Sequence, residues 1–146
     1  MNITIDIDSV IKDTEMNVSI LSRSIYDGNG NLLYDKVRIQ DRDRSLLESY
    51  ARSAFDAVLN SLGDFVVGSQ DMTLTLDDTR RFNEAIMIDL SSLVHQCVVN
   101  RVSGEWMKIK AVEYAPVFVG RAEDSMNVIF EKLRFKKEPT LKKYNN

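Results

Sequence analysis

The sequence contains few of the residues from which covalent cross-links and metal sites are built. Its 146 residues include one cysteine, Cys97, and one histidine, His95. A lone cysteine cannot form a disulfide within the chain, and the two residues together cannot supply the ligands of a Cys/His zinc site. We therefore expect no metal and no other cofactor. A chain of this length can bury enough apolar surface to fold as one domain without such staples.

Long uncharged runs are missing as well. The longest covers residues 90–100, far short of the roughly 18 residues that span a membrane. The first six residues have no basic region ahead of an apolar run, so they do not resemble a secretory signal. These features predict a soluble protein that is made in the cytoplasm and has no membrane partner.

The net charge of −3 conceals an uneven distribution. Residues 132–146 hold six basic side chains against Glu138, a charge of +5, which leaves −8 for residues 1–131. An acidic body repels nucleic acid over most of its surface, whereas the basic segment does not.

Short strands are predicted near the N-terminus and before the central helix. Ile3, Ile5 and Ile7 alternate with polar residues, and residues 72–76 alternate again, as half-buried strands do. Residues 33–39 are predicted as another strand. Asp8 or Ser9 is predicted to cap a short helix through Thr14, residues 16–26 fit helix or strand equally, and residues 27–31 form a turn.

Three longer segments have helical periodicity. The first begins near a capping box at Ser45, with Asp41 or Asp43 as alternative caps, and ends near Gly63. Its apolar face consists of Leu47, Tyr50, Ala51, Ala54, Phe55, Val58 and Leu62. The second follows a cap at Asp77, Asp78 or Thr79, with Phe82, Ile86, Leu90, Leu93, Val94, Cys97, Val102 and Trp106. The third has Pro116 in its first turn and ends before Pro139, with Phe118, Ala122, Met126, Ile129, Phe130 and Leu133.

The predicted fold class is therefore mainly α (α+β). It is a bundle of about three substantial helices with a few short β-strands near the N-terminus and before the long central helix. Residues 1–138 are predicted to form a single helical domain with minor strands, and residues 139–146 a basic C-terminal tail.

One acidic pair could carry chemistry. Asp6 and Asp8 follow a predicted strand as D-x-D-x-V, which resembles the first motif of haloacid-dehalogenase-like phosphatases and implies a nucleophile and an acid–base group beside Mg²⁺. However, only seven residues separate the candidate second and acidic motifs at Ser69 and Asp77, too few for a parallel crossover. We favour capping aspartates and keep the phosphatase as an alternative.

Two other patterns are weaker candidates. Asp27, Asn29 and Asn31 begin like a calcium loop, but Leu32 and Arg38 stand where that loop needs glycine and glutamate, so a polar turn is favoured. His95 and Cys97 lie two residues apart on a predicted helix and should point in nearly opposite directions. Cys97 is predicted in the core, and His95 either on the solvent side or as a histidine whose hydrogen bonds are satisfied.

The basic segment is the candidate interface. It interleaves basic, aromatic and apolar residues: Arg134, Phe135, Lys136, Lys137, Leu141, Lys142, Lys143 and Tyr144. It could contact phosphates, keep the protein in solution, or act as an arm that orders against a neighbouring subunit. We favour the arm because the body is acidic, with Leu141 and Tyr144 as its apolar anchors.

The order of these elements, with residues 3–8 (ITIDID), 105–108 (EWMK) and 133–139 (LRFKKEP), resembles small head–tail connector, or neck adaptor, proteins of tailed bacteriophages and prophages. The resemblance implies a non-enzymatic protein of the virion that forms a ring beneath the portal. Its partners would be copies of itself, the portal and tail-side neck proteins, with DNA passing through the channel. A helical protein-interaction module outside any virion is the other alternative.

Overall fold

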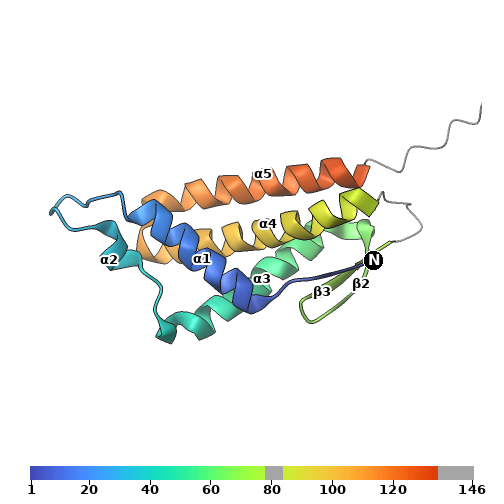
Figure 1. Cartoon of the computed structure of the whole chain (residues 1–146), viewed down its shortest axis with the longest axis horizontal. Helices are drawn as coiled ribbons and strands as arrows, with labels where there is room; N and C mark the ends of the chain where they lie inside the picture. Colours follow the sequence, from blue (N-terminus) through green and yellow to red (C-terminus); the bar gives the residue numbers. More distant parts are fainter. Residues whose placement is uncertain (78–83, 135–146) are drawn as a thin grey trace, which may run out of the picture.

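The computed structural model of the chain describes residues 1–77 and 84–134, apart from the side chains of residues 84–87. Within these ranges the protein is mainly helical, as predicted, with five α-helices and a three-stranded antiparallel sheet. The helices are α1 (Ile7–Ser22), α2 (Leu33–Val37), α3 (Arg44–Leu62), α4 (Glu84–Lys110) and α5 (Ala115–Arg134). Figure 1 shows α4 and α5 lying side by side, with α1 crossing in front of them.

Helix α4 is the centre of the bundle, and α1, α3 and α5 all pack on it. Its buried side chains point in several directions rather than along one stripe, with Cys97, Val99 and Met107 buried on different sides. A helix that is apolar on most sides must be surrounded by other elements. The predicted stripe is buried at Leu90, Val94, Cys97, Val102 and Trp106 and half-buried at Leu93, while Phe82 and Ile86 lie outside the described side chains.

Helix α1 is longer than the sequence predicted. It runs from Ile7 to Ser22 and therefore includes much of residues 16–26, for which the sequence fitted a helix and a strand equally well. Its buried face continues past Ile11 through Thr14, Val18 and Ser22. The hydroxyls of Thr14 and Ser22 donate to the carbonyls of residues four positions earlier, at 2.8 and 2.5 Å, so polar residues can occupy this apolar face.

The predicted strand over residues 33–39 is wrong, because residues 33–37 form the short helix α2. Leu33 and Val37 are both buried, and their spacing of four fits a helical turn as well as alternation. The Val37 carbonyl accepts a hydrogen bond from Trp106 Nε1 at 2.7 Å, which ties α2 to the far end of α4.

Helix α3 begins at Arg44 with Asp43, one of the two alternative caps, at its N-cap position, so the capping box predicted at Ser45 is wrong. The box belongs to the 3₁₀ turn Asp41–Asp43, where Gln40 and Asp43 exchange hydrogen bonds. The predicted apolar face of α3 is buried except at the half-buried Tyr50. The helix ends at Gly63, whose φ of 53° suits glycine, and the 3₁₀ turn Gly63–Phe65 follows.

The sheet has the order β1–β3–β2, and both pairings are antiparallel. Strand β1 (Asn2–Thr4) is shorter than predicted, and β3 (Thr73–Leu76) agrees with the prediction. Strand β2 (Val66–Gln70) was not predicted, because four of its five residues are exposed and show no alternation. Ile3 pairs with Leu74, and both side chains are buried under the bundle.

Helix α5 follows the 3₁₀ turn Val112–Tyr114 and has Pro116 in its first turn, as predicted. Its predicted face is buried at Phe118, Ala122, Met126, Ile129 and Leu133 and half-buried at Phe130. Gly104 on α4 permits a close approach of the two helices, since a Cβ there would lie 3.3 Å from Val119 Cγ2. The predicted end at Pro139 and the predicted tail lie outside the described residues.

We predict that Trp106→Phe lowers the free energy of unfolding by about 2 kcal/mol. The substitution leaves a small cavity in a fully buried site and removes the hydrogen bond to the Val37 carbonyl. Urea unfolding followed by circular dichroism measures the change. The control is Ile109→Ala on the exposed side of the same helix, which should change stability by less than about 0.5 kcal/mol. Equal effects of the two substitutions would contradict the prediction.

Candidate functional site

The candidate interface is only partly described. Arg134 is exposed at the last position of α5. The other predicted interface residues, Phe135, Lys136, Lys137, Leu141, Lys142, Lys143 and Tyr144, lie outside the described residues, so their role stays a prediction.

Asp6 and Asp8 have structural roles at the start of α1. Asp6 is the N-cap, and its carboxylate accepts from the Asp8 amide at 3.3 Å and the Ser9 hydroxyl at 2.8 Å. Asp8 forms an ion pair with Arg44 of α3, and that hydrogen bond raises the pKa of Arg44 above its usual value. The strand before Asp6 is antiparallel to its neighbour, whereas the phosphatase motif follows a strand of a parallel sheet. These contacts favour the capping interpretation.

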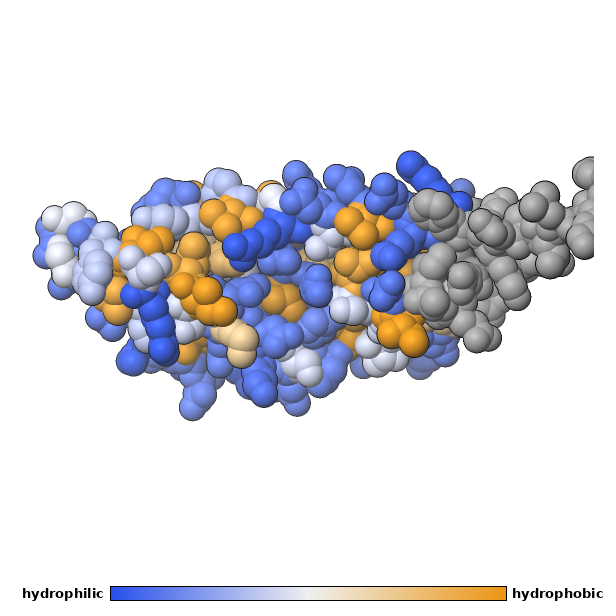
Figure 2. All heavy atoms as spheres, turned by 45° about the horizontal axis from the view of Figure 1, so that its top comes forward, coloured by the Kyte–Doolittle hydropathy of each residue, from blue (hydrophilic) through white to orange (hydrophobic). Residues whose placement is uncertain are grey.

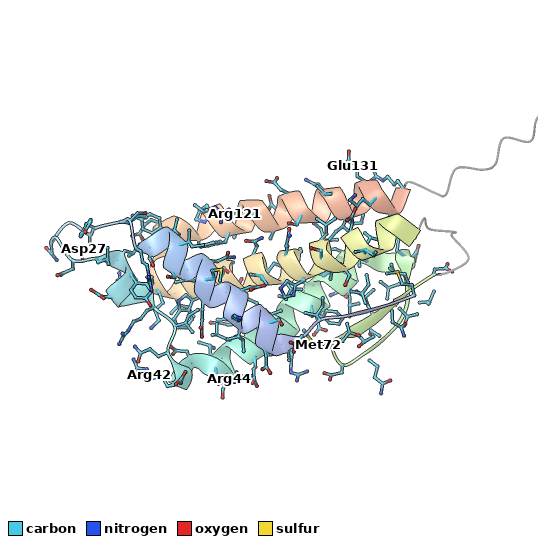
Figure 3. The ribbon with its side chains drawn as sticks, viewed as in Figure 1. Asp27, Arg42, Arg44, Met72, Arg121 and Glu131 are labelled. Atoms are coloured by element: carbon cyan, nitrogen blue, oxygen red, sulfur yellow. The ribbon has the colours of Figure 1, made fainter. Side chains whose placement is uncertain are left out.

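The polar turn at residues 27–31 also matches the favoured interpretation. Asp27 Oδ1 accepts from the backbone amides of Asn29 and Asn31, both at 2.9 Å, and Gly30 adopts a φ of 79°. This carboxylate oxygen therefore organises the turn itself. Figure 3 shows Asp27 at the tip of the molecule, far from Met72 in the turn between β2 and β3.

Cys97 and His95 lie on different sides of α4, as predicted. Cys97 is fully buried, and its Sγ lies 3.6 Å from the Ala122 carbonyl oxygen of α5. Burial raises the pKa of the Cys97 thiol, with Arg101 acting in the opposite direction. His95 Nε2 lies 2.7 Å from Asp13 Oδ2 of α1. The sequence does not predict the His95–Asp13 pair, because 82 positions separate the two residues.

The His95–Asp13 pair lies in a large hollow of the described surface. This hollow is an open groove of about 900 Å³ bounded by β1, the first half of α1 and α4. We call it the α4 groove. Asp6, Lys12, Asp13 and His95 supply polar groups to it, and Ile5, Met16 and Ile88 line it with apolar side chains.

A second hollow, of about 280 Å³, extends the α4 groove toward α5. The two share Asp13, Met16 and His95, and the second one reaches Arg121 of α5. Figure 3 shows Arg121 along the α5 edge of the bundle, opposite the α3 edge that carries Arg44. An elongated segment could therefore lie over α4 between α1 and α5.

Large apolar side chains are exposed along this region. Met16 is 54% exposed, Ile20 one helical turn further along α1 is 70% exposed, and Ile88 of α4 is 78% exposed. In Figure 2, which brings the top of the first view forward, hydrophobic side chains reach the surface among hydrophilic ones. The site offers an apolar contact surface with carboxylates on it rather than a set of groups converging on one reacting atom.

A third hollow, a cleft of about 290 Å³, lies among α3, α4 and α5. Tyr50, Arg101 and Glu105 are among its lining residues, and the Nε of Arg101 is buried without a hydrogen-bond partner in the described part of the chain. Burial, together with the Glu105 carboxylate, raises the pKa of Tyr50. Glu105 itself pairs with Lys108 at 2.9 Å, so the rim of this cleft is occupied by an ion pair.

Comparison with protein-family models, with curated proteins and with solved structures finds no match for this chain. No helix within residues 1–77 and 84–134 is long and apolar enough to cross a membrane. Over the same ranges no three His, Cys, Asp or Glu side chains are grouped closely enough to hold a metal ion.

We predict that Asp6→Ala lowers the free energy of unfolding by about 1 kcal/mol, because it removes the N-cap of α1. Asp8→Ala removes an exposed ion pair and should cost about half of that or less. Urea unfolding of the two variants measures the difference. A larger loss for Asp8→Ala would contradict the structural roles given to the two carboxylates.

We also predict that Cys97 reacts with a thiol reagent such as dithionitrobenzoate at least about a hundredfold more slowly in the native protein than in denaturant. Its Sγ is buried, and the raised pKa leaves less reactive thiolate at neutral pH. Absorbance at the released thiolate band follows the rate. Equal rates in the two conditions would show that Cys97 is accessible.

Proposed function

We propose that this protein is a non-enzymatic subunit of a protein assembly, and specifically a head–tail connector subunit that forms a ring beneath the portal of a tailed bacteriophage. In this proposal it belongs to the virion, and it contacts copies of itself, the portal and tail-side neck proteins. The connector role depends on the resemblance described for residues 3–8, 105–108 and 133–139, whereas the assembly role has support in the structure.

The observation that carries the assembly role is the exposure of Met16 and Ile88 in one groove, with the exposed Ile20 one helical turn beyond Met16 on α1. Single exposed apolar residues are common on monomeric proteins, but several large ones beside one hollow are typical of a contact surface. Covering them would remove apolar area from water, which favours association at about 25 cal/mol for each Å² buried.

The roles of the candidate catalytic residues support a non-enzymatic function. Asp6 caps α1, Asp8 pairs with Arg44, and Cys97 packs in the core beneath α5. Each of these three groups thus has a structural use. A second candidate, a helical interaction module outside a virion, shares the same surface and differs only in its partners.

The charge of the body supports the connector form of the proposal. Residues 1–131 carry a net charge of −8. A channel lined by acidic subunits repels the DNA backbone, so DNA can slide through it without binding tightly.

We predict that the purified protein forms a discrete oligomer and that Ile20→Ser weakens its association at least about tenfold, since it removes an apolar contact from the interface. Light scattering on a sizing column, over a wide concentration range, measures native mass against the 16.7 kDa of one chain. Val67→Ser is the matched control, because Val67 is 63% exposed on β2, away from the α4 groove. It should leave the oligomer unchanged.

If the native mass is that of a monomer at every concentration, the proposed ring is wrong. Two other results would favour the alternatives instead. Mg²⁺-dependent hydrolysis of a generic phosphate ester that Asp6→Asn abolishes would favour the phosphatase. Salt-sensitive DNA binding that disappears when residues 136–146 are removed would favour a nucleic-acid role for the basic segment.

A further inference from the structure

The cleft among α3, α4 and α5 has room for a small molecule. Figure 1 shows α4 between α5 and α3, and the cleft follows the side of α4 that carries Arg101, Glu105 and Lys108 at helical spacings of four and three. Ala57 of α3 and Ala122 of α5 also line it, and neither side chain is large enough to fill it. Its volume of about 290 Å³ is at the lower end of the range for ligand pockets, which suits a small molecule better than a peptide. We call it the Arg101 cleft.

Arg101 is the only arginine within residues 1–77 and 84–134 that is not exposed. Its Nε is buried without a hydrogen-bond partner in these ranges, and no carboxylate there forms an ion pair with its guanidinium. Its two terminal nitrogens are not among the buried atoms and donate to no oxygen of the described chain. Arg101 does lower the pKa of the Cys97 thiol, but a neutral thiol does not balance a positive charge. A half-buried cation in this state gains free energy when an anion pairs with it.

The carboxylates that line the cleft restrict the charge of that anion. Glu105 pairs with Lys108 at 2.9 Å, and Glu123 of α5 lines the cleft as well. The charged side chains of the cleft therefore sum to zero, with Arg101 and Lys108 against the two glutamates. A ligand with one negative charge pairs with the guanidinium, whereas two negative charges on a phosphate would be repelled more strongly by both glutamates. The planar guanidinium also matches the two oxygens of a carboxylate.

Hydroxyl and apolar groups complete the lining. Tyr50 and Ser53 of α3 supply hydroxyls, which can donate hydrogen bonds to an anion. Burial and the Glu105 carboxylate raise the pKa of Tyr50, so its hydroxyl keeps its proton at neutral pH. Ala54 and Val119 add apolar surface from α3 and α5. The lining thus suits an anion that carries a small apolar body.

We propose that the Arg101 cleft binds a small organic monocarboxylate, whose two oxygens accept hydrogen bonds from the terminal nitrogens of Arg101. The apolar part of the ligand lies against Ala57 and Ala122. This inference goes beyond the proposed assembly function and does not depend on it. The cleft lies on α4 between α3 and α5, whereas the α4 groove is bounded by β1, α1 and α4.

The test titrates the full-length ¹⁵N-labelled protein with benzoate at constant ionic strength. Nuclear magnetic resonance follows the Nε–H signals of the arginines, and the signal of Arg101 is identified by its absence in Arg101→Lys. We expect this signal to shift saturably, with half-saturation at about 1 mM benzoate or below. Benzamide, which has the same shape without the charge, should produce no saturable shift. Inorganic phosphate should bind at least about tenfold more weakly than benzoate.

Two substitutions remove different parts of the site. Arg101→Lys keeps the charge but loses the planar pair of donors, and should weaken benzoate binding at least about tenfold. Ala57→Leu keeps Arg101 and fills the cleft, and should weaken binding by at least as much. The matched control is Arg42→Gln, because Arg42 is an exposed arginine on the 3₁₀ turn Asp41–Asp43, outside the cleft. It should leave binding unchanged. Circular dichroism and urea unfolding establish that each variant folds.

Four results would overturn the proposal. The first is the absence of a saturable shift of the Arg101 signal with benzoate. The second is equal binding of benzamide, which would show that the cleft does not recognise the charge. Tighter binding of phosphate than of benzoate would contradict the monocarboxylate. Unchanged benzoate binding in Arg101→Lys would show that the guanidinium is not the group that holds it. The native mass of Arg101→Lys should equal that of the wild type, so this test and the test of assembly have separate readouts.

Discussion

The whole arrangement depends on helix α4, which carries buried side chains around most of its circumference. Val94, Val98 and Val102 are fully buried, and Cys97 and Val99 extend the apolar surface to both sides. Such a helix is unstable in water unless it is surrounded, so the remaining elements are arranged by the need to cover it. Helices α1, α3 and α5 do this with single apolar faces, and the Trp106 side chain continues the core to α2.

Helix α4 is open to solvent between α1 and α5, and the candidate site lies there. Between α1 and α5, the surface changes from core residues to the mixed lining of the α4 groove, with Ile88 and Met16 exposed beside Asp13 and His95. The Asp13–His95 contact joins α1 to α4 across this groove, which fixes the crossing of the two helices at that point. The groove is therefore a defined feature of the packed bundle rather than a gap between mobile parts.

The sequence was a good guide to the fold wherever a single local pattern determined the result. The faces of α3 and α5 follow a spacing of three and four, and Pro116 marks the start of α5 as expected. It was a poor guide where two patterns overlapped. Residues 33–39 alternate like a strand, yet Leu33 and Val37 also stand one helical turn apart, and the packing of Val37 against Trp106 decided for the helix.

The candidate site was harder to predict, because its parts come from distant positions. Nothing near Asp13 in the sequence indicates His95, and Ile88 lies off the apolar stripe of its own helix. The exposed Ile20 falls in the stretch where helix and strand fitted equally, so its direction could not be assigned before α1 was known to extend to Ser22. Local chemistry was easier. Cys97 as a core residue follows from its immediate neighbours, and so does a polar cap at the start of α1, although the cap is Asp6 and not the predicted Asp8 or Ser9.

The contact between Trp106 and Val37 has a practical consequence for spectroscopy. Trp106 is the sole tryptophan of the chain, and its indole is buried with its N–H on a carbonyl of α2. Its emission therefore reports on one place, the junction of α2 with the end of α4. Any binding event that loosens α2 would shift that emission toward longer wavelengths, whereas binding confined to the opposite end of the bundle would leave the spectrum unchanged. The protein thus carries an intrinsic optical probe that distinguishes its two ends.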